Sequence, residues 1–208
     1  LEFRRVLFRS DAVFAGAMTG HGAEINDFCP SAFVQPGPPV LSVAMGLAEL
    51  HNKSGAALLS AVIAGYEIGC RMPKALGVEN LRRMGIANHG IGSIFGAATA
   101  AGSMLAFSPS QANDLMSYTA QVASGSWQWL LDIEHIEKAY VFAGLGAQNG
   151  LQAALLVEAG MTGVADCFDR PGNFMDNGAF TAAGSDIDRA YLVEDLGKRF
   201  ELPLVGYK

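Results

Sequence analysis

A histidine and three polar side chains lie close together near the start of the chain, and their types suit proton transfer. They are His21, Glu24, Asn26 and Asp27. His21 and Glu24 are three positions apart, which places them on one face of a helix, where the carboxylate orients the imidazole. General acid–base catalysis needs an imidazole held in this way. The alternative is a helix C-terminus whose polar residues are solvated.

A second candidate group combines His89 with Arg82 and Arg83. Arginine presents a planar fork of N–H donors that matches a carboxylate, so these side chains suit a carboxylate ligand. The alternative is that both arginines lie on the surface and that His89 only caps a helix.

A third group is Lys138 with Glu134, His135 and Glu137, which concentrates charge in an apolar neighbourhood. A partly buried lysine next to an anionic substrate would stabilise developing negative charge and take part in proton transfer. The alternative is a solvated helical turn with internal ion pairs.

The helix that must position His89 begins in the glycine-rich stretch of residues 85–102, GIANHGIGSIFGAATAAG. No charged side chain occurs from His89 to Ser108, so a helix over residues 91–106 must be packed on most sides. A membrane span is a second interpretation of such a stretch. Its commonest residues are Ala, Gly and Ser, and Lys/Arg clusters do not flank both ends. We therefore expect a central buried helix instead.

Cap signals and periodicity predict the remaining elements. Ser54 suits the N-cap of a long helix over residues 55–76 that ends at Gly77, and Ser108 opens a capping box. The long helix is expected to bury an apolar stripe: Leu58, Leu59, Val62, Ile63, Tyr66 and Cys70. Other helices are expected from residue 11 to a turn near residue 26, and over residues 40–51, 109–123, 145–159 and 186–195. Loops are expected over residues 77–85 and 166–181, and a strand over residues 200–206, which makes the chain mainly α.

Glu67 and Arg71 are four positions apart on the long helix and can form an ion pair. Such a pair is worth roughly a few tenths of a kcal/mol if it is exposed.

Composition narrows the class of protein. The chain has 208 residues, of which 50% are apolar and 16% charged, with a formal net charge of −6. This charged fraction is well below the roughly 25% of an average soluble domain, so we expect much of the surface to meet another domain or subunit.

The acidic balance argues against a nucleic-acid partner, and the tryptophans at 127 and 129 are therefore expected in the core. Three cysteines without metal-ligand spacing indicate buried thiols in a reducing cytoplasm, without a zinc site or a disulfide.

No phosphate-binding loop, nucleophile elbow, HExxH motif or dinucleotide fingerprint occurs in the sequence. Taken in order, however, several segments resemble the MmgE/PrpD family, which includes 2-methylcitrate dehydratase and cis-aconitate decarboxylase. The resemblance covers about residues 12–180 and rests on these segments: TGHGAEIND, PGPPVLSVAMGLAE, SGAALLSAVIAGYEIGCR, LRRMGIANHGIGSIFGAATAAG and EKAYVFAGLGAQNGLQAALLVEAGMTG.

The resemblance implies a large all-helical domain joined to a smaller α/β domain, in a homodimer, with an active site in the cleft between the two domains. On this interpretation residues 11–180 are the multi-helix domain. Residues 181–208 begin the α/β domain or the connection to it, and the chain is a fragment that lacks most of the α/β lid. Residues 1–10 contain three arginines and no initiator Met, and are expected to be foreign or disordered.

Residue by residue, TGHGAEIND matches the family's AHALDFDD. His21 then takes the position of the family's histidine, and Glu24, Asn26 and Asp27 take its three acidic positions. Lys138 matches the lysine of the family's Thr-Lys pair.

Two histidine positions of the family are altered. Its His-Pro in the next loop is Gln35-Pro36 here. Its Gly-Phe-His-Pro reads GIAN from residue 85, with Ala87 at the histidine position and His89 two residues further on. These two changes are compatible with the enzyme class of the family. They also allow a divergent subgroup whose substrate is a different carboxylic acid.

The resemblance predicts a cytoplasmic lyase, a dehydratase or decarboxylase, that acts on a di- or tricarboxylic acid such as 2-methylcitrate without a metal or other cofactor. Catalysis is assigned to His21, Asp27, His89 and Lys138, and substrate binding to Glu24, Gln35, Arg82 and Arg83. The alternative is a non-catalytic helical binding or dimerisation module derived from that family, which the changed residues Gln35 and Ala87 favour. The fragment alone is expected to be inactive, and neither nucleic acid nor a membrane is expected as a partner.

Overall fold

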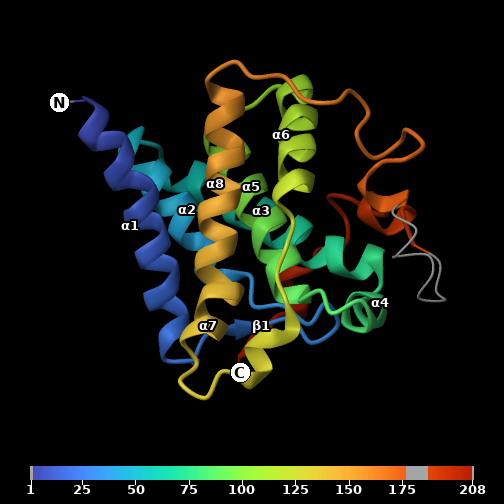
Figure 1. The fold of residues 1–208 in the computed structure, drawn as a ribbon. Coiled ribbons are helices and arrows are strands. Elements are labelled where there is room, and N and C mark those ends of the chain that lie inside the picture. Colours follow the sequence, from blue (N-terminus) through green and yellow to red (C-terminus); the bar gives the residue numbers. More distant parts are fainter. Residues whose placement is uncertain (1, 177–186, 208) are drawn as a thin grey trace.

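The computed structural model describes the backbone of residues 2–176 and 187–207, with side chains from residue 10 onward, and it is mostly helical (Figure 1). The α-helices are α1 (Glu2–Gly22), α2 (Gly37–Leu50), α3 (Gly55–Leu76), α4 (Val78–Arg83), α5 (Asn88–Met104), α6 (Pro109–Val122), α7 (Ile136–Ala139) and α8 (Leu145–Glu158). A π-helical turn, Tyr140–Gly144, joins α7 to α8, and short 3-10 helices occur at Trp127–Leu131, Phe174–Asp176, Ala190–Leu192 and Leu202–Leu204. Strands β1 (Asp27–Phe28) and β2 (Gly206–Tyr207) pair antiparallel. The prediction of a mainly α fold is confirmed.

Helix α5 lies at the centre and is buried along almost its whole length, as its lack of charge predicts (Figure 1). Its glycines allow the backbone of α3 to approach closely, because a Cβ on Gly96 would lie 2.9 Å from the carbonyl oxygen of Gly65. On the opposite face, a Cβ on Gly150 of α8 would lie 2.6 Å from the backbone nitrogen of Ala98. The tight packing on both sides holds the first turn of α5, which carries His89, in a fixed position.

Local signals set the helix ends. The Ser54 hydroxyl accepts a hydrogen bond from the N–H of Ala57 at 3.2 Å, and α3 ends at Gly77, whose φ of 84° suits glycine. Ser108 and Gln111 form both hydrogen bonds of the predicted capping box, at 3.1 and 3.3 Å. Among the described helices none is both long and apolar enough to cross a membrane.

Several local predictions are wrong. The expected loop over residues 77–85 contains helix α4, and the expected strand over residues 200–206 is a 3-10 helix followed by the short strand β2. In the apolar stripe of α3, Leu59 is 64% exposed and Ile63 is 36% exposed. The reason is that α3 packs on α5 through its glycine face, which turns these two side chains outward.

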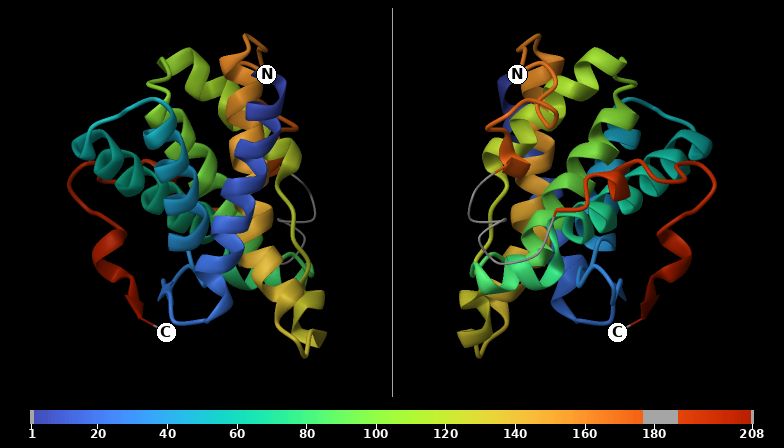
Figure 2. Two further views of the ribbon diagram at one scale, coloured as in Figure 1. Left: turned by 90° about the vertical axis from the view of Figure 1, so that its left-hand side faces the viewer. Right: turned by 90° about the vertical axis from the view of Figure 1, so that its right-hand side faces the viewer.

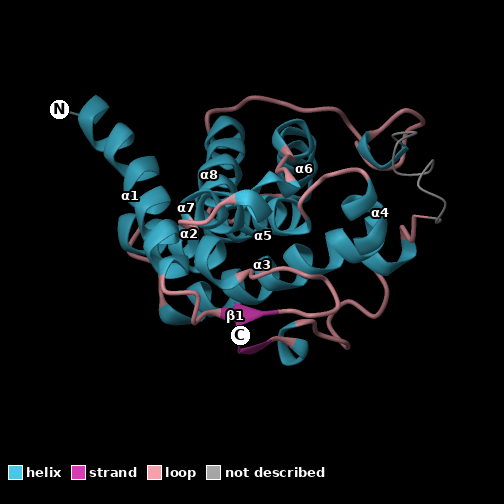
Figure 3. Ribbon diagram, turned by 60° about the horizontal axis from the view of Figure 1, so that its bottom comes forward, coloured by secondary structure: helices cyan, strands magenta, loops and turns pink. Residues whose placement is uncertain are grey.

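The segment of residues 187–207 lies along the outside of α3, as both views in Figure 2 show. Strand β2 at its end pairs with β1 beneath α3, where Asp27 lies opposite Tyr207 (Figure 3). The expected short helix over residues 186–195 is reduced to the 3-10 turn Ala190–Leu192, and Asp186 lies outside the described residues. The assignment of residues 181–208 to a second domain stays a prediction.

At the other end of the chain, α1 begins at Glu2, so residues 2–10 belong to the same helix as His21. Their expected foreign origin stays a prediction.

Candidate active site

An ion pair joins two of the predicted groups, although they are far apart in the sequence. Lys138 on α7 places its Nζ 2.6 Å from Oε2 of Glu24, which follows the end of α1. The second carboxylate oxygen, Oε1, lies 2.5 Å from Nδ1 of His135. The side chain of Lys138 is 9% exposed and that of Glu24 is 23% exposed. Lys138 is therefore a nearly buried cation whose carboxylate partner faces the protein on one side and solvent on the other.

His21 lies in the last turn of α1 and is buried. Its Nδ1 is 3.0 Å from Nδ2 of Asn26, which has two protons to donate. In the neutral ring an accepting Nδ1 leaves the proton on Nε2. Asn26 therefore orients His21 in the way that the sequence suggested for Glu24.

His89 lies in the first turn of α5 and is only 2% exposed. Its ring stacks on Phe142 with a centroid separation of 3.5 Å and an interplanar angle of 7°. The rings of Phe33, Trp127 and Trp129 pack around its other sides, at 5.1, 6.2 and 5.6 Å. We call Phe33, Trp127, Trp129 and Phe142 the aromatic wall.

Phe142 is the side chain around which the three groups meet. His21 lies 5.1 Å from the centre of its ring, and His89 lies 3.5 Å from it. The ammonium of Lys138 is 5.7 Å from the same ring, a distance typical of a cation–π contact. Phe142 belongs to the π-helical turn after Lys138, and π-helical turns are frequent at functional sites. Two imidazoles, an ammonium and a carboxylate thus gather from the ends of α1, α5 and α7.

The matching family model describes the MmgE/PrpD N-terminal domain and covers residues 4–182 of the chain. The chain belongs to the MmgE/PrpD family. This family includes lyases such as dehydratases. No curated protein matches the chain significantly.

Asp27, at the third acidic position of the MmgE/PrpD motif, is engaged in the fold. Both of its carboxylate oxygens lie 3.1 Å from the backbone N–H of Gly37, at the start of α2, and the Tyr66 hydroxyl bonds to it as well. Burial raises the pKa of Asp27, although the hydrogen bonds from Tyr66 and Gly37 oppose that shift. The structure therefore places Asp27 between α2 and α3, as a link between helices rather than as a partner of Lys138. Gln35 lies buried in the loop before α2.

Arg82 and Arg83 lie on α4, and their side chains are 69% and 57% exposed. Each approaches Glu79 of the same helix, at 3.8 and 3.6 Å. Their position on the surface matches the alternative interpretation of this group, whereas His89 is buried. Sequence reasoning grouped these arginines with His89 because it assigned them to a loop that leads to it.

The aromatic wall is the part of the site that sequence reasoning missed. Trp127 and Trp129 were expected in the core, yet both are only partly buried and pack against His89. Phe142 follows Lys138 by four positions, a helical spacing that would have placed both on one face. Phe33 carries no sequence signal, because its contact with His89 depends on the loop before α2.

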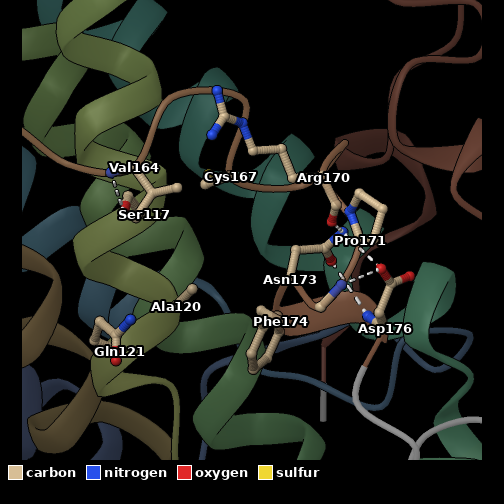
Figure 4. A pocket seen from close by; sticks show the side chains of 11 residues that line it. Ser117, Ala120, Gln121, Val164, Cys167, Arg170, Pro171, Asn173, Phe174 and Asp176 are labelled. Carbon is tan, nitrogen blue, oxygen red and sulfur yellow. Dashed lines mark hydrogen bonds between the residues drawn. The ribbon is translucent and has the colours of Figure 1, made fainter.

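A separate pocket of about 510 Å³ lies between α6 and the segment 164–176 (Figure 4). It is lined by Ser117, Ala120, Gln121, Val164, Cys167, Arg170, Pro171, Gly172, Asn173, Phe174 and Asp176. None of the site residues predicted from the sequence is among these. In the described part of the chain, no group of three or more His, Cys, Asp and Glu side chains is placed to hold a metal ion.

Proposed function

We propose that the chain carries the catalytic groups of a lyase that dehydrates or decarboxylates a di- or tricarboxylic acid such as 2-methylcitrate. The observation that supports this proposal is the convergence of His21, His89, Lys138 and Glu24 around Phe142. Acid–base groups next to a nearly buried ammonium suit removal of a proton from the carbon beside a carboxylate.

In the proposed mechanism a substrate carboxylate takes the place of Glu24 beside the ammonium of Lys138. His89 removes the proton from the adjacent carbon, and Lys138 stabilises the negative charge that develops on the carboxylate. The electron pair of the broken C–H bond forms a C=C bond as the C–O bond breaks. His21, whose Nε2 carries a proton when Asn26 donates to Nδ1, protonates the departing hydroxide to water.

The test is the turnover of 2-methylcitrate, citrate and cis-aconitate by this chain in its full-length context. We expect His89→Ala and Lys138→Ala each to lower kcat/KM about 100-fold or more, because each removes a group that acts in the transition state. Matched controls are His51→Ala and Lys53→Ala, which change exposed residues of the same types and leave turnover unchanged. Unchanged rates in both the His89 and the Lys138 variants would contradict the assignment.

The non-catalytic module makes a different prediction for the same panel. It would bind these acids, as seen by thermal stabilisation, without consuming any of them. The presence of both imidazoles at the cluster supports the enzyme, because a binding module does not need groups that transfer protons.

A further inference from the structure

The surroundings of His89 and Lys138 are mainly aromatic, whereas the three carboxylates of a tricarboxylate would need cationic or hydrogen-bonding partners. His89 is enclosed by the four rings of the aromatic wall, at centroid separations from 3.5 to 6.2 Å. The same wall lies under Lys138, whose ammonium is 5.9 Å from the Trp129 ring and 5.7 Å from the Phe142 ring. A ligand that reaches both His89 and Lys138 therefore meets the rings of the aromatic wall.

The charges at the cluster support the same conclusion. In the described part of the chain, Lys138 is the permanent cation at the cluster, and Glu24 already neutralises it. A substrate carboxylate that displaces Glu24 gains this ammonium. A further carboxylate placed against the rings of the wall would lose its hydration, which costs free energy unless a partner compensates for it. An aryl group in that position would instead stack on them.

We propose that the aromatic wall determines specificity, and that the preferred substrate is an acid with an aryl or branched apolar group in place of a third carboxylate. This inference rests on the proposed function and narrows the substrate class of the same site. It assigns Trp127 and Trp129 a role in recognition that is separate from the proton transfers of His89 and His21.

Phe33 marks the route by which such a group enters. It is 36% exposed, and its φ of 55° is in the left-handed region, which a bulky side chain rarely adopts. Its ring stacks on Trp127 at 6.0 Å with an interplanar angle of 27°, and it makes an edge-to-face contact with His89 at 5.1 Å. A ligand ring that replaces Phe33 on Trp127 reaches His89 and keeps the stacking contact.

The test uses the fact that the chain has two tryptophans, both of which belong to the aromatic wall. Intrinsic tryptophan fluorescence therefore reports on this site alone. The probes are phenylsuccinate and tricarballylate, which share a succinate skeleton and differ in a phenyl group against a carboxymethyl group. We expect phenylsuccinate to bind with a Kd roughly three- to tenfold lower than that of tricarballylate.

Variants distinguish a specific effect of the aromatic wall on ligand preference from a general loss of protein stability. Trp127→Leu should remove the preference for phenylsuccinate, whereas Trp127→Phe, which keeps a ring, should retain it; Trp129 is the reporter in both. Phe174→Leu, in the pocket of Figure 4, is the matched control and leaves the preference unchanged. Equal or tighter binding of tricarballylate, an unaltered preference in Trp127→Leu, or no fluorescence response to either probe would overturn the proposal.

This experiment does not depend on catalysis. Preference of this chain for phenylsuccinate, together with no turnover of any acid in the full-length context, would contradict the lyase and leave the role of the aromatic wall standing. Turnover of tricarboxylates together with tight binding of tricarballylate would support the lyase and contradict the role of the aromatic wall.

Discussion

The Glu67–Arg71 and Glu24–Lys138 ion pairs both join a nearly buried cation to a carboxylate, but their surroundings differ. Arg71 donates from Nε to Glu67 at 3.1 Å, and its other nitrogens donate to three backbone carbonyls of residues 191, 194 and 199. Lys138 has Glu24 on one side and aromatic rings on the other. Backbone carbonyls cannot be exchanged, so Arg71 is fixed as a structural cation. The carboxylate partner of Lys138 is the side chain of Glu24, which a substrate carboxylate can replace.

The largest effect on stability is expected from Arg71→Met. This change removes the cation that pairs with Glu67, whose carboxylate then keeps the backbone N–H groups of Glu201 and Leu202, and it frees three carbonyls of the segment 187–207. Breaking a buried pair in this way costs about 3–5 kcal/mol of unfolding free energy, measured by urea denaturation. The matched control is Arg83→Met, which changes an exposed arginine and should cost less than about 0.5 kcal/mol. A loss below about 1 kcal/mol in Arg71→Met would show that the segment is held by its other contacts.

The next effect is expected from Glu201→Gln, in the same network. Glu201 pairs with Lys74, and its second oxygen accepts from the Tyr191 hydroxyl at 2.8 Å. Loss of these charge-assisted bonds should cost about 2 kcal/mol at pH 7. The control Glu194→Gln, on the same segment but 54% exposed, should cost less than about 0.5 kcal/mol.

The same pair predicts how stability depends on pH. Burial raises the pKa of Glu201, but hydrogen bonds from Lys74 and Tyr191 outweigh it, so that the pKa lies below its ordinary value of 4.5. The stabilisation is therefore complete above pH 4.5 and is lost as pH falls through the folded pKa. Burial lowers the pKa of Lys74, but the contact with Glu201 raises it above 10.5 overall. That contribution is present below pH 10.5 and is lost as pH rises through the folded pKa, so Glu201→Gln should flatten both limbs of the stability curve.

Lys138→Met should separate function from stability. Glu24 keeps its contact with His135 and part of its exposure to solvent, so we expect a stability loss of about 1 kcal/mol. Activity should fall about 100-fold, since the ammonium acts on charge that develops in the transition state. Lys53→Met serves as the exposed control. A stability loss as large as that of Arg71→Met would show that Lys138, like Arg71, has a mainly structural role.

These two networks also show what the sequence could predict. The bounds of α3 and the cap of α6 were predictable because Ser54, Gly77 and Ser108 act on residues within one turn of themselves. The burial of Glu67 and Arg71 was not, because the segment that covers them lies more than 120 positions later, and the helix and strand predicted there did not indicate that it packs on α3.

The candidate site likewise contains residues that the sequence identified and residues that it missed. Glu24 and Lys138 are 114 positions apart, so the local sequence around either residue does not indicate that they pair. Family resemblance selected both residues, but separately, as substrate-binding and catalytic groups. The aromatic wall was missed because tryptophan and phenylalanine in an apolar chain are as typical of a core as of a binding surface.

The smallest effects are expected at the arginines that sequence reasoning assigned to substrate binding. Arg82→Ala and Arg83→Ala remove exposed partners of Glu79, so each should change the unfolding free energy by less than about 0.5 kcal/mol. If Lys138 is the cation that meets the substrate carboxylate, each should also leave KM for the acid unchanged, in contrast to Lys138→Met. The comparison is a steady-state titration of all three variants with one acid. A several-fold rise in KM in either arginine variant would show that α4 approaches the ligand. The exposed arginines would then join Lys138 as cations that act on the ligand, whereas Arg71 and Lys74 would remain structural ones.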